Sequence, residues 1–205
     1  GAAGPECKLP DVGNLHHFCH GFLLSVHRLH PGKHVLDESQ QLDFIREVTD
    51  ALREEPNEIV EEIFADYEED DKSPYPDILS AVLISHQWRL GIPACYLRQV
   101  PPQMHELVEC GVISRLERAY TGLKRKFQSV DFDDLVNETF LYLTKNPLDD
   151  DRRFDWVQID EVQDLNPLQW RIVKELTSTR AVSVYFGDVE QSIFSFLGAS
   201  ASTFA

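Results

Sequence analysis

The sequence predicts an α/β fold with a long all-helical middle, and two observations support this prediction. Toward the C-terminal end, β-favouring residues fill two short runs, 156–159 and 181–186, and a helical pattern lies between them. A strand, a helix and a second strand in this order favour a parallel βαβ unit. Between about residues 35 and 127, apolar residues instead recur at the three- and four-residue spacing of helices. The ends and the middle are therefore expected to differ in structure.

Composition and cysteine usage indicate a soluble globular protein. The 205 residues are 42% hydrophobic and 26% charged, which suffices for a core and for one or two domains. No apolar run could span a bilayer and no charged-then-apolar leader opens the sequence, so we expect a cytoplasmic protein with no membrane partner. Four cysteines are scattered without a CxxC spacing, which indicates reduced thiols.

The net charge of −16 argues against a surface that attracts nucleic acid everywhere. Much of the acid is concentrated in residues 54–71 and 149–151, which leaves room for a local basic or aromatic track. The strongest basic run closes the helix expected over 101–127, where cations either complement the helix dipole or face phosphate. These cations are Arg115, Arg118, Lys124, Arg125 and Lys126.

The individual helices follow from apolar spacing and from breakers. They are expected over 14–29, 39–66 with a break at Pro56, 78–90, 101–127, 131–145 and 167–177. Ser39 is the expected cap of the second, Asn166 caps the last, and residues 67–76 form a surface loop. In the first helix, His16 and His20 lie one turn apart. Because no acid accompanies them, their pattern favours packing over a metal site.

Two adjacent carboxylates, Asp160 and Glu161, follow the strand expected over 156–159. The C-terminal end of a buried parallel strand is where α/β folds bind ligands. One such carboxylate can hold Mg²⁺, and its neighbour can orient or deprotonate a water. The alternative is the solvated end of a strand, because an acidic pair alone is a weak signal. A third interpretation is an unrelated Mg²⁺-dependent phosphohydrolase that uses Asp160 and Asp188.

Longer patterns carry a resemblance to a known family. VQIDEVQD at 157–164 and GDVEQSIFSFLGA at 187–199 resemble motifs II and III of the UvrD/Rep/PcrA family of superfamily 1 DNA helicases, in the family's order and separation. DFDDL at 131–135 resembles a segment that leads back from a helical insertion, and NLHHFCHGFLL at 14–24 resembles, less closely, an upstream TFHxF-type motif.

The resemblance implies a discontinuous architecture. Residues 1–34 and 128–205 would form part of a P-loop NTPase motor domain with a RecA-like parallel sheet. Residues 35–127 would be an all-helical insertion that interrupts it. In such a domain the strands that end at Asp160 and at Gly187 would run parallel.

The resemblance also implies roles in nucleotide chemistry. Asp160 would hold Mg²⁺ on the phosphates of ATP, and Glu161 would activate the attacking water. Gln191 would sense the γ-phosphate, since an amide both donates and accepts hydrogen bonds. Gln163 and Asp164 would link the nucleotide site to neighbouring motifs.

The same resemblance implies a second group of functional residues. Asp188, at the start of the second motif, would belong to the nucleotide site. Phe194 and Phe196 would offer stacking faces to single-stranded DNA, and His16 would touch the DNA backbone. Without the motif, core packing would be the preferred role of the two phenylalanines.

The sequence departs from the family's pattern at several points. The phosphate-binding loop GxxxxGK[ST] is absent, as is everything beyond motif III, and Leu197 stands where the family usually has Arg. Phe194 replaces the usual Tyr and Asn14 a Thr. We therefore expect part of an ATP-dependent DNA helicase or translocase, inactive without the remainder of the helicase chain. The alternative is a helicase-derived DNA- or protein-binding module that has lost its ATPase.

Overall fold

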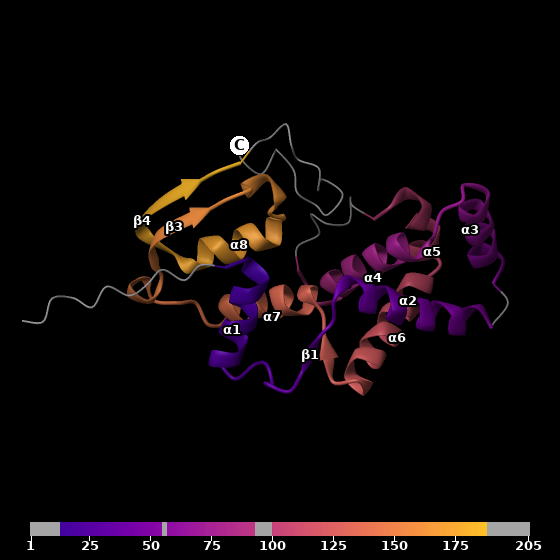
Figure 1. The fold of residues 1–205 in the computed structure, drawn as a ribbon, viewed down its shortest axis with the longest axis horizontal. Coiled ribbons are helices and arrows are strands. Elements are labelled where there is room, and N and C mark those ends of the chain that lie inside the picture. The colour runs from indigo at the N-terminus through magenta and orange to yellow at the C-terminus, as the bar shows by residue number, and fades with distance from the viewer. Residues whose placement is uncertain (1–12, 55–56, 93–99, 188–205) are drawn as a thin grey trace, which may run out of the picture.

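The computed structural model describes residues 13–54, 57–92 and 100–187 (Figure 1). The first part of the chain contains α1 (Leu15–Ser25), β1 (His34–Val35), α2 (Glu38–Arg53), α3 (Glu58–Glu69) and α4 (Tyr75–Arg89). It continues with η2 (Pro102–Met104), α5 (His105–Glu109), α6 (Val112–Lys126), β2 (Ser129–Val130) and α7 (Phe132–Lys145). The last part contains η3 (Asp150–Arg152), β3 (Phe154–Ile159), η4 (Val162–Asp164), α8 (Pro167–Leu176) and β4 (Thr177–Tyr185).

The described residues are mostly helical and include two short parallel strand pairs. In the first pair, His34 lies opposite Ser129, so β1 and β2 join the two ends of the helical middle. In the second pair, β3 and β4 run parallel, with Trp156 opposite Val182 and Ile159 opposite Tyr185. The parallel βαβ unit predicted around α8 is therefore confirmed.

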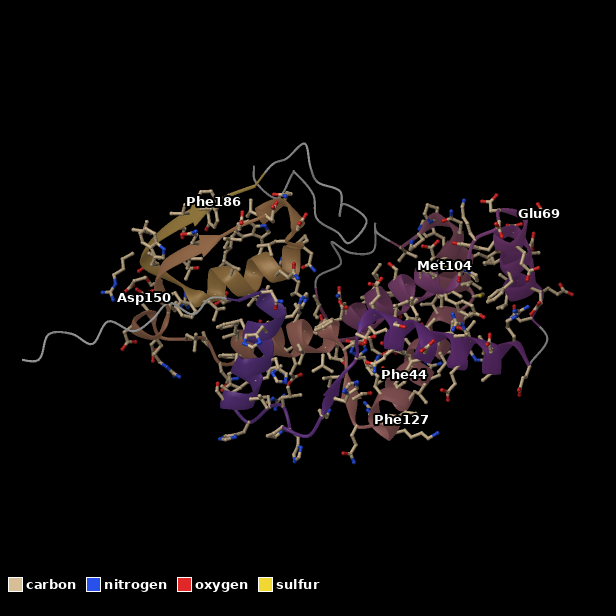
Figure 2. The ribbon with its side chains drawn as sticks, viewed as in Figure 1. Phe44, Glu69, Met104, Phe127, Asp150 and Phe186 are labelled. Carbon is tan, nitrogen blue, oxygen red and sulfur yellow. The ribbon has the colours of Figure 1, made fainter. Side chains whose placement is uncertain are left out.

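The elements are arranged along the long axis of the molecule (Figure 1). The strand pair β3–β4 and α8 lie at one end, with α1 and α7 below α8 in this view, and α3 and α5 lie at the other end. Figure 2 shows Phe186, which follows β4, and Glu69, which ends α3, toward opposite ends of the molecule.

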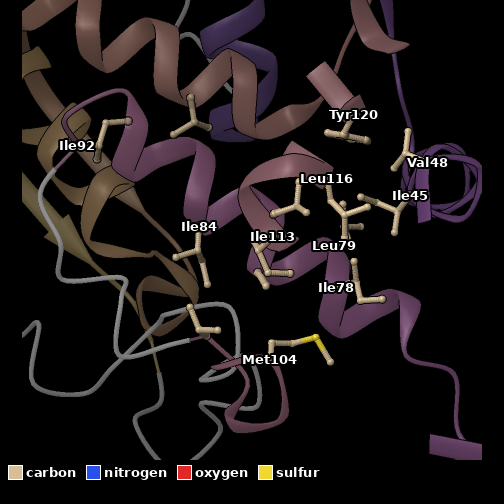
Figure 3. Close-up of a cluster of buried hydrophobic side chains, with 14 of the residues drawn as sticks. Ile45, Val48, Ile78, Leu79, Ile84, Ile92, Met104, Ile113, Leu116 and Tyr120 are labelled. Carbon is tan, nitrogen blue, oxygen red and sulfur yellow. The ribbon is translucent and has the colours of Figure 1, made fainter. Parts of the chain in front are cut away.

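The helical middle is built on a core shared by α2, α4 and α6 (Figure 3). Ile45 of α2, Ile78 of α4 and Leu116 of α6 are buried there, and Met104 packs beside them. Burying one such aliphatic side chain contributes about 1.5–3 kcal/mol to stability. This core explains why apolar spacing predicted the helices of the middle segment.

The helix α7 packs against both α1 and α8, although α1 precedes it by more than a hundred residues. Leu135 and Leu143 of α7, Leu23 of α1 and Ile172 of α8 are buried. Asn166 caps α8, and Pro167 occupies its first turn, as the sequence predicted. Segments from the two ends of the chain therefore share one core.

Several predicted helix boundaries were wrong, and local chemistry explains three of them. Gly111, with φ of 82°, separates α5 from α6, so residues 101–127 do not form one helix. Asp37 rather than Ser39 caps α2, because Asp37 and Gln40 satisfy each other's backbone N–H groups in a capping box. The predicted loop 67–76 is shorter, because buried Tyr67 extends α3 and donates a hydrogen bond to Asp77 in the first turn of α4.

The second strand of the βαβ unit also begins earlier than predicted, at Thr177 rather than residue 181. Polar side chains tie this early part to its neighbours. Ser178 Oγ donates to Asp155 Oδ1 at 2.6 Å, and the backbone N–H of Thr179 donates to Asp150 Oδ1 at 2.8 Å. These bonds tie residues 178 and 179 to η3 and to the start of β3.

The prediction that β3 is a buried strand was wrong for the described part of the chain. Trp156 is 61% exposed, and Phe154 and Val182 are also exposed. The strand pair packs on α8, as the T-shaped contact between Trp170 and Tyr185 illustrates, with ring centroids 5.2 Å apart. Within the described ranges no helix is long and apolar enough to cross a membrane.

Candidate nucleotide site

The candidate site lies where β3 and β4 end side by side. The N–H of Phe186 donates to the carbonyl of Ile159 at 2.8 Å, and the N–H of Val162 donates to the carbonyl of Phe186 at 2.9 Å. These two bonds fasten the chain that leaves β3 to the chain that leaves β4. As a result, the segment 160–164 lies directly against Gly187.

A sharp backbone turn places the two carboxylates. Glu161 adopts a left-handed conformation, with φ of 50° and ψ of 44°. A residue other than glycine held in this region costs on the order of 1–3 kcal/mol, and such residues cluster at functional sites. The Asp160 carboxylate stabilises the turn, because its Oδ1 accepts the N–H of Glu161 at 3.0 Å. Both acidic side chains are exposed, as a ligand site requires.

A buried amide holds the Glu161 carboxylate. Gln163 is only 4% exposed, and its Nε2 donates to Glu161 Oε2 at 2.6 Å. Asp164 follows in the same 3₁₀ turn, and its N–H donates to the carbonyl of Glu161 at 2.9 Å. One buried oxygen of Asp164 has no hydrogen-bond partner among the described residues. The turn therefore fixes Glu161 through both backbone and side-chain contacts.

The donor set fits a Mg²⁺ ion that arrives with a phosphate ligand. Magnesium is usually bound through one or two carboxylates, with waters and substrate phosphates completing its shell. Asp160 offers an exposed carboxylate of this kind. No group of three or more His, Cys, Asp or Glu side chains gathers into a metal site within the residues that the structure describes.

Gly187 is a site residue that sequence reasoning missed. A Cβ atom there would lie 2.7 Å from Val162 Cγ1 and well inside van der Waals contact of Gln163 Oε1. Only glycine therefore allows β4 to end so close to the turn. The glycine that directly follows an apolar strand was the available signal, because glycine at such a position often marks a close backbone approach.

The predicted site residues fall into three groups: one turn after β3, the residues of the second motif, and His16 on α1. Asp160, Glu161, Gln163 and Asp164 are brought together in one turn. The predicted residues of the second motif lie outside the described residues; they are Asp188, Gln191, Phe194 and Phe196.

His16 lies apart from this turn, on α1. Its ring packs on Phe132 with centroids 5.0 Å apart, and burial lowers the pKa of its imidazole. Phe132 starts α7, is 38% exposed, and packs on the His16 ring.

The predicted basic end of α6 contains a buried ion cluster that the sequence did not reveal. Lys124 is 4% exposed, so it neither caps the helix dipole from solvent nor faces phosphate. Its Nζ donates to Asp131 Oδ2 at 2.7 Å and to Asp134 Oδ2 at 2.6 Å. Tyr120 also donates to Asp131 Oδ2, at 3.0 Å. The carboxylates of the DFDDL segment therefore fasten the start of α7 to α6.

Burial and like charges perturb the titration of this cluster. Burial, together with the charges of Asp131 and Asp134, raises the pKa of Asp133 to about 7. Burial and the charge of Asp131 also raise the pKa of Asp134. Burial alone would lower the pKa of Lys124, but the attraction of Asp131 and Asp134 outweighs it and leaves that pKa raised.

Comparison with known proteins identifies the family. The chain is similar to the ATP-dependent DNA helicase Rep of Buchnera aphidicola, with 32% identity over 93 residues, which are 44% of this chain and 14% of that protein. It is 34% identical over 91 residues to the ATP-dependent DNA helicase PcrA of Bacillus subtilis, covering 43% of this chain and 12% of the relative.

A longer match, 27% identical over 173 residues, joins 77% of this chain to 15% of the RecBCD enzyme subunit RecB of Mycolicibacterium smegmatis. The chain thus spans a small part of each of these relatives. The family profile of the UvrD/REP helicase N-terminal domain matches residues 2–205, which is nearly the whole chain. The chain belongs to the UvrD/REP helicase N-terminal domain family.

Proposed function

We propose that this chain is part of an ATP-dependent DNA helicase or translocase and supplies residues for Mg·ATP hydrolysis. The observation that carries the proposal is the turn at the end of β3, where a strained Glu161 stands beside an exposed Asp160 and is held by buried Gln163. Two differently held neighbouring carboxylates suit a metal-binding and a proton-accepting role.

In this proposal each residue of the turn has one task. Asp160 binds the metal of Mg·ATP, which would neutralise charge on the transferred phosphoryl group. Glu161 takes the proton of the attacking water, and Gln191 contacts the γ-phosphate. Gln163 and Asp164 connect this turn to neighbouring segments, and Asp188 completes the nucleotide site.

The proposed partner is single-stranded DNA. Phe194 and Phe196 would stack on bases, and base stacking on an aromatic side chain contributes about 1–3 kcal/mol per base. His16 would touch the DNA backbone. Its packing on Phe132 holds the imidazole in place, and its lowered pKa favours a neutral donor over a cation.

We also propose that residues 1–34 and 128–205 form one discontinuous motor half-domain and that residues 35–127 are a helical insertion. Two contacts support this division. The parallel pair of β1 and β2 closes the insertion at its base. The packing of α7 on both α1 and α8 joins the segments before and after it.

The alternative is a helicase-derived DNA- or protein-binding module without hydrolysis; these 205 residues contain no GxxxxGK[ST] pattern, which is compatible with both interpretations. A phosphate loop supplies the backbone N–H groups and the lysine that hold the phosphates. We therefore expect the chain of residues 1–205 alone to bind Mg·ATP no more tightly than the millimolar range in isothermal titration. The longest natural polypeptide that contains it should hydrolyse ATP, and single-stranded DNA should stimulate the reaction.

The three outcomes separate the interpretations. Hydrolysis by the long polypeptide and none by the chain alone supports the proposal. The absence of hydrolysis in both, with DNA or protein binding retained, would favour the module. Hydrolysis by the chain alone would favour an independent phosphohydrolase that uses Asp160 and Asp188.

A further inference from the structure

Gln163 connects Glu161 to the end of the neighbouring strand β4. We propose that Gln163 is the positioning residue for the Glu161 carboxylate. Gly187 has no side chain and so leaves the space that the Gln163 amide needs to keep its bond to Glu161. The proposal rests on the proposed role of Glu161 in ATP hydrolysis, and it adds two residues that set the geometry of that role.

Both ends of the Gln163 amide are constrained. Its Nε2 donates to Glu161 Oε2 at 2.6 Å, while its Oε1 lies against the space where Gly187 has no Cβ. Turning the amide over would place its carbonyl oxygen against the carboxylate, and two acceptors repel each other. The orientation of Gln163 is therefore fixed by the negative charge of Glu161 on one side and by β4 on the other.

The backbone leaves little freedom for Gly187 to move. The N–H of Val162 donates to the carbonyl of Phe186, and a Cβ at Gly187 would lie 3.2 Å from the Val162 nitrogen. Val162 is itself buried. A Cβ at Gly187 would also lie 2.7 Å from Val162 Cγ1, so the added volume must displace both the buried Val162 side chain and the more flexible end of Gln163. The displacement of Gln163 breaks its bond to Glu161.

The loss of this bond changes the chemistry that Glu161 can perform. A general base must lie within hydrogen-bond reach of the proton that it removes. An exposed carboxylate without its donor samples several rotamers, and small misplacements at a reacting centre cost up to about a hundredfold in rate. Binding of the nucleotide, which in this proposal depends on Asp160, should change little.

The test uses the longest natural polypeptide that contains the chain. Gly187→Ala and Gln163→Leu are each expected to lower kcat by about 10- to 100-fold with KM for ATP nearly unchanged. The matched control is Gly122→Ala in α6, where an added Cβ meets no atom within 4 Å. Its kcat should equal that of the wild type.

A double variant tests whether Gly187 and Gln163 act through the same contact with Glu161 or affect kcat independently. With Gln163→Leu already present, Gly187→Ala should cause little further loss, because both act through one contact. Multiplicative losses, or a wild-type kcat in Gln163→Leu, would overturn the proposal. If Gly187→Ala does not fold, the kcat of Gln163→Leu alone still tests whether Gln163 positions Glu161.

A structural measurement keeps the proposal independent of the proposed function. In a crystal structure of Gly187→Ala, the Gln163 Nε2 atom should no longer lie within hydrogen-bond distance of Glu161. An intact bond between Gln163 and Glu161 in this variant would refute the proposed role of Gly187 even if the protein has no ATPase activity. If the wild-type protein has no ATPase activity, the proposed function is contradicted. A displaced Gln163 in Gly187→Ala would still establish the contact between Gly187 and Gln163.

Discussion

Glu161→Gln is expected to lower the ATP turnover of the polypeptide that contains this chain by about a hundredfold or more. General-base catalysis typically contributes about 10²–10⁴ to rate, and an amide cannot accept the proton of the attacking water. Glutamine keeps the size of the side chain, and its carbonyl can still accept the hydrogen bond from Gln163. Nucleotide affinity should therefore remain close to that of the wild type.

Single-turnover hydrolysis and nucleotide titration would measure the two quantities separately. Glu47→Gln is a suitable control, because Glu47 is an exposed glutamate on α2, outside the candidate site. If both variants hydrolyse ATP at the same rate, Glu161 is not the base. A loss of nucleotide binding in Glu161→Gln would instead assign Glu161 a binding role.

Lys124→Met is expected to lower the free energy of unfolding by about 3–5 kcal/mol, the usual cost of removing one partner of a buried ion pair. Lys124 is almost fully buried and donates to both Asp131 and Asp134. Methionine fills a similar volume but leaves these carboxylates without their cation. Chemical denaturation of the chain should show the loss.

The control is Lys126→Met, two residues further along α6, where the exposed ammonium lies 5.2 Å from the centroid of the Phe127 ring. An exposed contact of this kind contributes about 0.5–1 kcal/mol. If the two variants lose the same free energy of unfolding, the buried ion cluster does not stabilise the fold as proposed.

The loss of unfolding free energy in Lys124→Met should depend on pH, and the direction of this dependence gives a further test. Carboxyl groups whose pKa is raised in the folded state bind protons that the unfolded chain does not, so stability falls as pH rises through that window. Asp133, with a pKa of about 7, already contributes in this direction. Asp134, whose pKa is also raised, contributes in the same direction. Loss of the Lys124 charge favours the protonated form of these carboxyl groups, so the penalty of the substitution should shrink as the pH is lowered.

Much of the fold could be predicted because local patterns determine it. The cap at Asn166 with Pro167 defined the start of α8, and β-favouring residues on either side of that helix predicted the parallel pair β3–β4. Asp160 and Glu161 directly follow β3, as predicted, because strand ends and charge changes are visible within a few residues.

The remaining features depend on contacts between distant residues. The burial of Lys124 needs Asp131 and Asp134 from the next helix, and a basic run at a helix end usually indicates solvent exposure. The contact between Gly187 and Gln163 joins residues on two different strand ends. The left-handed conformation of Glu161 is not favoured by its residue type, so only the hydrogen bonds of the turn reveal it.

The location of the metal tests the central claim most directly. The polypeptide that contains this chain would be crystallised with Mn²⁺ and a non-hydrolysable ATP analogue, and anomalous scattering would place the metal. We predict a peak beside Asp160, bound to its carboxylate directly or through one coordinated water, and a second water within about 2.6–3.2 Å of the Glu161 carboxylate. A nucleotide and metal bound elsewhere, with Asp160 and Glu161 both facing bulk solvent, would contradict the account.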